Sequence, residues 1–195
     1  MRGLRSTLDL AARHERLVML CSFQKEESVL LDELARAAPH ARVVTIDTGV
    51  LFAQTLQTWR AFEDHFGITI EIEDASGPWT GPEQCCGDAK VAALERALRG
   101  ADGWISGLRR EQGPTRAATE LVEIDVKRGG IAKYNPLAFW TERELWQRIH
   151  ERGLPYNPLH DDGYESIGCA PCTGRGSGRE GRWAGTDKTE CGLHV

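Results

Sequence analysis

The sequence predicts an α/β protein with a mostly parallel, twisted sheet and flanking helices. Short apolar runs alternate with segments whose apolar residues recur every three or four positions, which is typical of strands followed by amphipathic helices. Polar, turn-forming residues directly follow the first two apolar runs. In such folds the ligand site lies at the carboxyl ends of the strands, so we expect these polar turns to carry function.

Two strand–loop–helix units open the chain. Residues 17–20 are all apolar and predict a buried strand, and the polar turn 22–26 leads into a helix that carries apolar residues between 29 and 34. Residues 43–46 predict a second strand, which ends at Asp47-Thr48-Gly49. A helix follows, with its apolar residues on one face: Phe52, Leu56, Trp59 and Phe66.

Further elements follow in the same order. Residues 68–72 alternate apolar and polar side chains like a strand, Val91, Leu94 and Leu98 mark a helix, and residues 104–106 predict another strand. Thr141 and Glu144 form a capping box that starts a last helix. Gly153 and Pro155 supply the stop signal for that helix.

The chain length predicts one domain. It has 195 residues, of which 41% are hydrophobic, enough for a single sizeable core. Residues 173–189 are rich in glycine and charge and show almost no apolar periodicity. We therefore expect a single domain over residues 1–172, which would bind its ligand at the strand ends, and a mobile, unpacked C-terminal tail over residues 173–195.

Composition excludes several classes of function. A formal net charge of -5 lacks the basic excess that nucleic-acid binding requires. The longest apolar run near the N-terminus is residues 17–21, too short for a signal peptide or a membrane span. We expect a cytoplasmic protein, where clustered cysteines more often bind metal or do chemistry than form structural disulfides.

Four of the six cysteines form two close pairs. Cys85 and Cys86 are adjacent, and Cys169 and Cys172 form a CxxC. Four thiolates suit a zinc ion or an iron–sulfur cluster, and the adjacent pair fits zinc spacing poorly. A thioredoxin-like redox role for the CxxC is disfavoured because the glycine-rich residues after it cannot sustain a helix.

The other two cysteines stand apart. Cys191, near the end of the tail, could reach into a cleft and then swing out to a second protein, as a two-step thiol reaction requires. An incidental exposed thiol explains Cys191 equally well on residue chemistry alone. Cys21, which follows the first strand, is interpreted as a small core residue.

Taken together, these motifs resemble the adenylyl-sulfate and phosphoadenylyl-sulfate reductases of the adenine-nucleotide α-hydrolase-like superfamily. The resemblance runs from about Leu17 to the C-terminus, and the cysteine pairs and the terminal motif are its most specific parts. Its carriers are Ser22-Phe23-Gln24-Lys25-Glu26, Asp47-Thr48-Gly49, Cys85-Cys86, Gly107-Leu108-Arg109-Arg110, residues 133–137, the CxxC and Glu190-Cys191-Gly192-Leu193-His194.

The resemblance implies a reaction and a cofactor. Cys85, Cys86, Cys169 and Cys172 would hold a 4Fe-4S cluster, which marks the branch that reduces adenosine 5'-phosphosulfate to sulfite and AMP. Cys191 would be the nucleophile and carry an S-sulfocysteine intermediate, with thioredoxin or a similar dithiol as reductant. The residues implied to bind substrate are Ser22, Gln24, Leu51, Lys90, Gly107, Arg116, Arg179, Arg182 and His194.

Some positions depart from the family pattern, and alternatives stay open. Phe23 and Gln24 occupy positions where superfamily members that cleave ATP have glycines, which argues against ATP cleavage. The chain also has Gln54 where a glutamate is expected. The alternatives are reduction of the 3'-phosphorylated nucleotide, or of both nucleotides, ATP-dependent thiolation, and a zinc-binding module. The oligomeric state is open, with a homo-oligomer as one candidate.

Overall fold

A six-stranded sheet forms the centre of the molecule. The computed structural model describes residues 3–78, 81, 87–183, 186–188, 190, 191 and 193. The strands in these residues lie in the order β3 (Ile70–Asp74), β2 (Arg42–Asp47), β1 (Leu17–Leu20), β4 (Gly103–Ile105), β6 (Ile131–Tyr134) and β5 (Val122–Asp125). Only β5 is antiparallel to its neighbour, so the predicted, mostly parallel sheet is confirmed.

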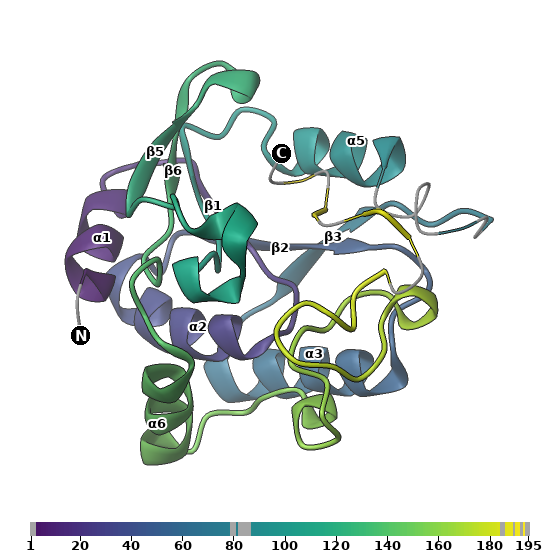
Figure 1. The fold of residues 1–195 in the computed structure, drawn as a ribbon. Coiled ribbons are helices and arrows are strands. Elements are labelled where there is room, and N and C mark those ends of the chain that lie inside the picture. Colours follow the sequence, from purple (N-terminus) through teal and green to yellow (C-terminus); the bar gives the residue numbers. More distant parts are fainter. Residues whose placement is uncertain are drawn as a thin grey trace.

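Helices cover both faces of this sheet (Figure 1). The described α-helices are α1 (Leu4–Ala11), α2 (Lys25–Ala37), α3 (Ala53–Phe66), α5 (Asp88–Ala97) and α6 (Glu142–Arg152). Short 3₁₀ turns are η1 (Arg110–Gln112), η2 (Pro114–Arg116), η3 (Val126–Arg128), η4 (Pro158–His160) and η5 (Ala170–Cys172). Helices α1, α2 and α3 pack on one face, α6 packs outside α2, and α5 covers β2 and β3 from the other face.

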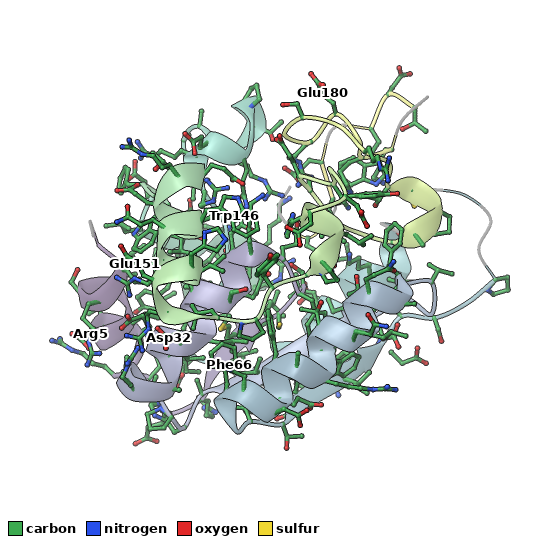
Figure 2. The ribbon with its side chains drawn as sticks, turned by 90° about the horizontal axis from the view of Figure 1, so that it is seen from below. Arg5, Asp32, Phe66, Trp146, Glu151 and Glu180 are labelled. Atoms are coloured by element: carbon green, nitrogen blue, oxygen red, sulfur yellow. The ribbon has the colours of Figure 1, made fainter. Side chains whose placement is uncertain are left out.

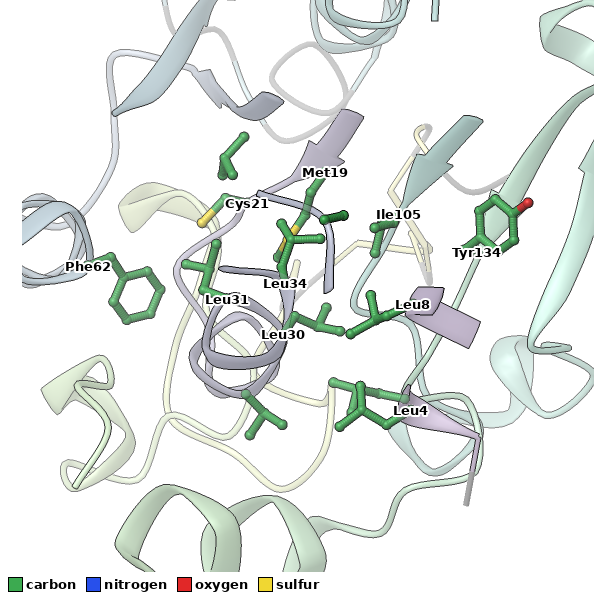
Figure 3. Close-up of a cluster of buried hydrophobic side chains, with 14 of the residues drawn as sticks. Leu4, Leu8, Met19, Cys21, Leu30, Leu31, Leu34, Phe62, Ile105 and Tyr134 are labelled. Carbon is green, nitrogen blue, oxygen red and sulfur yellow. The ribbon is translucent and has the colours of Figure 1, made fainter. Parts of the chain in front are cut away.

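The core has two parts because the central strand β1 is buried on both sides. Leu17 and Met19 point into the larger cluster beneath the sheet, together with Leu30 of α2 and Phe62 of α3 (Figure 3). Val18 points to the opposite face, into the cluster under α5. A strand buried on both faces explains why residues 17–20 are all apolar instead of alternating.

The predicted helix boundaries follow local capping chemistry. At the start of α6 the Glu144 backbone N donates to Thr141 Oγ1 at 3.2 Å, and the Thr141 backbone N donates to Glu144 Oε2 at 2.8 Å. Gly153 ends the helix in the left-handed conformation, with φ 59°. Figure 2 shows α6 from below, with Trp146 labelled on the helix.

Three elements were not predicted from the sequence: helix α1 and the antiparallel pair β5 and β6. None of the described helices is both long and apolar enough to cross a membrane.

The C-terminal segment corrects one expectation. Residues 173–183 form neither helix nor strand, yet they pack: Thr173 pairs with Arg182, and the Trp183 backbone N donates to the Cys172 carbonyl at 2.9 Å. Trp183 is only 2% exposed. The segment is therefore not unpacked, and its mobility stays a prediction.

Candidate active site

A pocket opens at the carboxyl ends of the parallel strands. The chain runs from β1 outward to β3 on one side and from β4 to β6 on the other, so the connections diverge between β1 and β4. A switch of this kind leaves a crevice where open α/β sheets bind ligands. The crevice is lined by the loops after β1, β2 and β4, the start of α5 and the C-terminal segment, including Leu20, Ser22, Gln24, Thr45, Leu51, Lys90, Ser106, Gly107, Arg116, Cys169, Arg179, Arg182, Cys191 and Leu193.

The loop after β1 is held in an unusual backbone conformation. Phe23 has φ 60°, the left-handed region that glycine adopts most easily. Its ring is buried and stacks on Trp59 with 5.2 Å between ring centroids. The next side chain, Gln24, accepts a hydrogen bond from the Ile167 backbone N at 2.9 Å. The loop is therefore fixed by the core below and by the C-terminal half of the chain.

Two adjacent carboxyl groups at the start of α2 have opposite protonation tendencies. Burial would raise the pKa of Glu26, but the charges of Arg109 and Lys25 outweigh burial and lower it to about 2. Burial and the neighbouring Glu26 charge raise the pKa of Glu27 to about 8. Ser22 Oγ and the Gln24 backbone N both donate to Glu27 Oε2, which leaves Oε1 as the place for a proton.

Gly107 permits the close approach of β4 to α2. A Cβ at this position would lie 2.7 Å from Glu27 Oε1 and 3.1 Å from Glu26 Cβ. Any larger residue would push the first turn of α2 away from the end of β4. This steric role is observed, and the role of Gly107 in nucleotide binding stays a prediction.

Three cysteines gather at one wall of the pocket. Cys169, Cys172 and Cys191 are buried and pack with Trp183 in a small cluster. The CxxC segment is held against the loop after β2, because the Ala170 backbone N donates to the Val50 carbonyl at 2.8 Å. Thr48 Oγ1 lies within hydrogen-bond distance of Cys169 Sγ, at 3.1 Å.

These buried sulfurs fit one half of a four-thiolate site. Cys169 and Cys172 are three residues apart across a 3₁₀ turn, a spacing that places two side chains on the same side. Cys85 and Cys86 lie outside the described residues. Among the residues that are described, no group of three or more histidine, cysteine or acidic side chains could hold a metal ion.

Basic side chains line the wall of the pocket beside this cysteine cluster. Arg182 Nη1 donates to the Ile167 carbonyl at 3.1 Å, and both Arg179 and Arg182 lie over the Trp183 ring. Arg116 and Arg179 both contact the carboxylate of Glu190. Burial and the Arg116 charge lower the pKa of Arg179 to about 10, against the pull of Glu190. This wall carries more positive than negative charge and suits an anion.

The structure gathers most of the predicted site residues around one pocket. Ser22, Gln24, Leu51, Lys90, Gly107, Arg116, Arg179, Arg182, Cys169 and Cys191 all line it. Cys172 packs beside Cys169 and Cys191, and His194 lies outside the described residues. Sequence reasoning missed Glu27, Gln112 and Glu190, which also contact the pocket or its arginines. A pair of carboxylates directly after a strand and loop could have pointed to Glu27.

Comparison with known sequences gives relatives that are named as reductases of sulfate nucleotides. Residues 16–175 match the family described as the phosphoadenosine phosphosulfate reductase domain. The chain is 43% identical to the adenosine 5'-phosphosulfate reductase of Bacillus pumilus (strain SAFR-032), over 99% of this chain and 91% of that protein. It is 42% identical to the enzyme of the same name from Staphylococcus haemolyticus (strain JCSC1435), over 92% of this chain and 81% of that one.

Solved structures agree on the fold. The phosphoadenylyl-sulfate (PAPS) reductase of Candida auris, solved as a phosphate complex, superposes with a TM-score of 0.72 at 26% identity, covering 87% of this chain and 89% of that one. The FMN adenylyltransferase of Candida glabrata superposes with a TM-score of 0.70 at 16% identity, over 90% of this chain and 65% of that one, a likeness of fold alone. Both neighbours have the predicted adenine-nucleotide α-hydrolase-like fold. From its sequence and its fold, the chain belongs to the phosphoadenosine phosphosulfate reductase domain family.

Proposed function

We propose that this protein reduces adenosine 5'-phosphosulfate to sulfite and AMP, a cytoplasmic step of sulfate assimilation. The observation that carries the proposal is the shared pocket: Cys191 lines it together with Arg116, Arg179 and Arg182. A thiol and a cluster of cations facing one cavity suit nucleophilic attack on an anionic substrate. The named relatives above support the choice of nucleotide.

In the first step the Cys191 thiolate attacks the sulfur of the sulfonate group. A bond forms between Sγ and that sulfur, the bond from sulfur to the phosphate oxygen breaks, and AMP leaves with the electron pair. The protein then carries an S-sulfonate on Cys191. Phosphate is a good leaving group, so the demand on the protein is to orient the reactants and to stabilise the departing charge.

The cations around the pocket match that demand. Lys90 lines the pocket from the first turn of α5, and Arg116, Arg179 and Arg182 line the same pocket. In the described part of the chain, Nε of Arg179 and Nε of Arg182 are buried with no hydrogen-bond partner. Buried donors of this kind are costly unless paired, and an anionic ligand would satisfy them. Their positions support binding of the phosphosulfate here.

In the second step a dithiol protein of the thioredoxin class attacks Sγ of Cys191. The bond between the two sulfurs breaks, sulfite leaves with the electron pair, and a mixed disulfide forms. The second thiol of the reductant then restores Cys191 and leaves the reductant as a disulfide, so its two electrons have reduced sulfate to sulfite. Because Cys191 is 6% exposed, this exchange requires the thiol to leave the pocket.

We further propose that Cys169 and Cys172, with Cys85 and Cys86, hold a 4Fe-4S cluster. When bound, the cluster would hold the two cysteine pairs together and make this wall of the pocket rigid, without exchanging electrons with the substrate. The Thr48 hydroxyl beside Cys169 Sγ would then donate to a ligand sulfur. Anaerobically purified protein should contain four iron and four acid-labile sulfide per chain, numbers set by the cluster type. Stoichiometric zinc without sulfide would favour the zinc-binding alternative.

Intact mass spectrometry tests the reaction directly. Anaerobic protein is incubated without reductant with adenosine 5'-phosphosulfate or with its 3'-phosphorylated relative, alongside a Cys191→Ser control. We expect a single sulfonate on the wild type, formed faster from the first nucleotide, and none on the control. Faster reaction with the second nucleotide would identify a phosphoadenylyl-sulfate reductase. No adduct from either nucleotide would refute the reductase proposal and favour an ATP-dependent thiolation enzyme.

A further inference from the structure

The Glu190 carboxylate is enclosed by hydrogen-bond donors. Arg116 donates to it from Nε at 2.9 Å and from Nη2 at 2.7 Å, and Arg179 donates from Nη2 at 2.7 Å. The Thr115 hydroxyl adds a fourth contact at 3.1 Å. The side chains of Glu190, Arg116 and Arg179 are only 7%, 9% and 14% exposed. Charge-assisted bonds shielded from water in this way fix geometry strongly.

The same carboxylate is joined to the proposed nucleophile. Glu190 directly precedes Cys191, and the Cys191 backbone N donates to Glu190 Oε1 at 2.9 Å. Cys191 is 6% exposed and packs against Cys169, Cys172 and Trp183. A shift of the carboxylate would therefore move the thiol as well.

We propose that Glu190 is a positioning residue, whose contacts with Arg116 and Arg179 dock the C-terminal segment and hold Cys191 in the pocket for its attack. The proposal rests on the proposed function, because it takes Cys191 as the nucleophile. It assigns Glu190 no contact with the reacting atoms.

A competing interpretation is that Glu190 only fills the anion site until substrate displaces it. Residue adjacency argues against that interpretation, since displacing Glu190 would withdraw Cys191 at the moment when the thiol is needed. Charge also argues against it. Two guanidinium groups face one carboxylate, so a net positive charge remains for a substrate anion, and Arg182 and Lys90 line the same pocket.

The test compares Glu190→Gln with Glu180→Gln. Glu180 is exposed on the same segment, points away from the body of the protein (Figure 2) and forms no ion pair with any described residue, so its variant removes the same charge without the docking contacts. The first readout is the single-turnover rate of adduct formation on Cys191 at saturating adenosine 5'-phosphosulfate. We expect E190Q to lower this rate about tenfold or more, in keeping with the loss of charged hydrogen bonds, and E180Q to leave it unchanged.

A second readout needs no nucleotide. The rate of Cys191 alkylation by iodoacetamide is followed by peptide mass mapping across a range of pH. If E190Q removed only the neighbouring negative charge, the pKa of the thiol would fall. The curve of alkylation rate against pH would then shift to lower pH, and the plateau rate reached at high pH would not change. Undocking exposes the thiolate and raises the plateau itself, by about tenfold for a contact of this kind. Glu190→Asp keeps the charge on a shorter side chain and should give intermediate values in both assays.

A third readout separates docking from competition. Nucleotide affinity is measured in Cys191→Ser and in the double variant that also carries Glu190→Gln, where no adduct can form. Affinities within about threefold of each other support positioning. A tenfold gain in affinity, or wild-type values for the adduct rate and the alkylation plateau in E190Q, would overturn the proposal. Failure of the wild type itself to form an adduct would instead refute the proposed function, and the alkylation plateau would still test docking.

Discussion

Replacing Phe23 separates two effects that its position combines. Its backbone has φ 60°, which is strained for any residue with a Cβ, while its ring is buried against Trp59 and Phe62. Phe23→Ala removes the ring and keeps the strain, whereas Phe23→Gly removes both. We predict that the glycine variant is the more stable of the two, the reverse of the usual order in regular structure.

The burial and the backbone conformation of Phe23 set the expected changes in the free energy of unfolding. Truncating a fully buried phenylalanine to alanine costs about 3–5 kcal/mol, and the stacking on Trp59 places Phe23 within that range. A left-handed conformation costs a residue with a Cβ about 1–2 kcal/mol, and glycine avoids this cost. Glycine loses about 0.5–1 kcal/mol more conformational entropy on folding. The difference between these two effects is about 0–1.5 kcal/mol, so Phe23→Gly should exceed Phe23→Ala by about 0.8 kcal/mol, the middle of that range, in free energy of unfolding.

Phe62 supplies a matched control, because it is equally buried but lies in the middle of α3 with helical backbone. There the glycine variant should be less stable than the alanine variant by about 1 kcal/mol. Anaerobic urea denaturation of all four variants measures the two differences, with equal m-values as the condition for comparing them. If glycine is also the less stable choice at position 23, the strain argument is wrong.

Two further predictions concern the charged groups at the start of α2. Because Glu27 is protonated in the folded protein up to about pH 8 but ionises near 4.5 when unfolded, its stabilising contribution is complete below pH 4.5 and is lost as the pH rises through about 8. Relative to Glu27→Gln, the free energy of unfolding should fall by up to ~1.4 kcal/mol per pH unit in this window, and parallel pH curves from urea denaturation would contradict it. Arg109→Met leaves the buried Glu26 carboxylate without its guanidinium partner and should lower the free energy of unfolding by about 3–5 kcal/mol. Adding Glu26→Gln should recover part of this loss. Strictly additive losses in this double-mutant cycle would rule out the coupling.

The fold was largely predictable because its central elements obey local rules. The all-apolar run 17–20 matches a strand buried on both faces, and Thr141 and Glu144 start α6 by a local capping box. The edge strand β5 is different, because its apolar side chains are exposed and not buried. Val122, Ile124 and Val126 alternate with Glu123 and Asp125, so a strand signal was present and was overlooked, although Val122 and Ile124 are 40% and 64% exposed in the fold. Helix α1 had a signal that was overlooked, since Leu4, Leu8 and Ala11 share one face.

One part of the candidate site was also predictable from the sequence, and another part was not. Ser22, Gln24 and Gly107 follow strands directly, so sheet topology alone brings them together. The C-terminal segment is different, because its burial comes from partners distant in sequence. Arg116 and Glu190 are 74 residues apart, and hydropathy treats each as a solvated charge. Only the folded chain shows that they exclude water from one another.

Ion pairs are suited to holding the C-terminal segment reversibly, because the proposed function requires this segment to leave the pocket once per reaction cycle. In the proposed function Cys191 must be held for the attack and then reach a second protein. An apolar anchor released into water would lose its burial energy without compensation. Glu190 regains hydration when it separates from its arginines, which offsets part of the free energy lost with the ion pairs. Trp183 is 2% exposed and its backbone N donates to the Cys172 carbonyl, so we expect the start of the segment to stay in place when Cys191 leaves the pocket. The distribution of charged and apolar contacts along the segment thus reconciles its observed packing with the mobility predicted for its end.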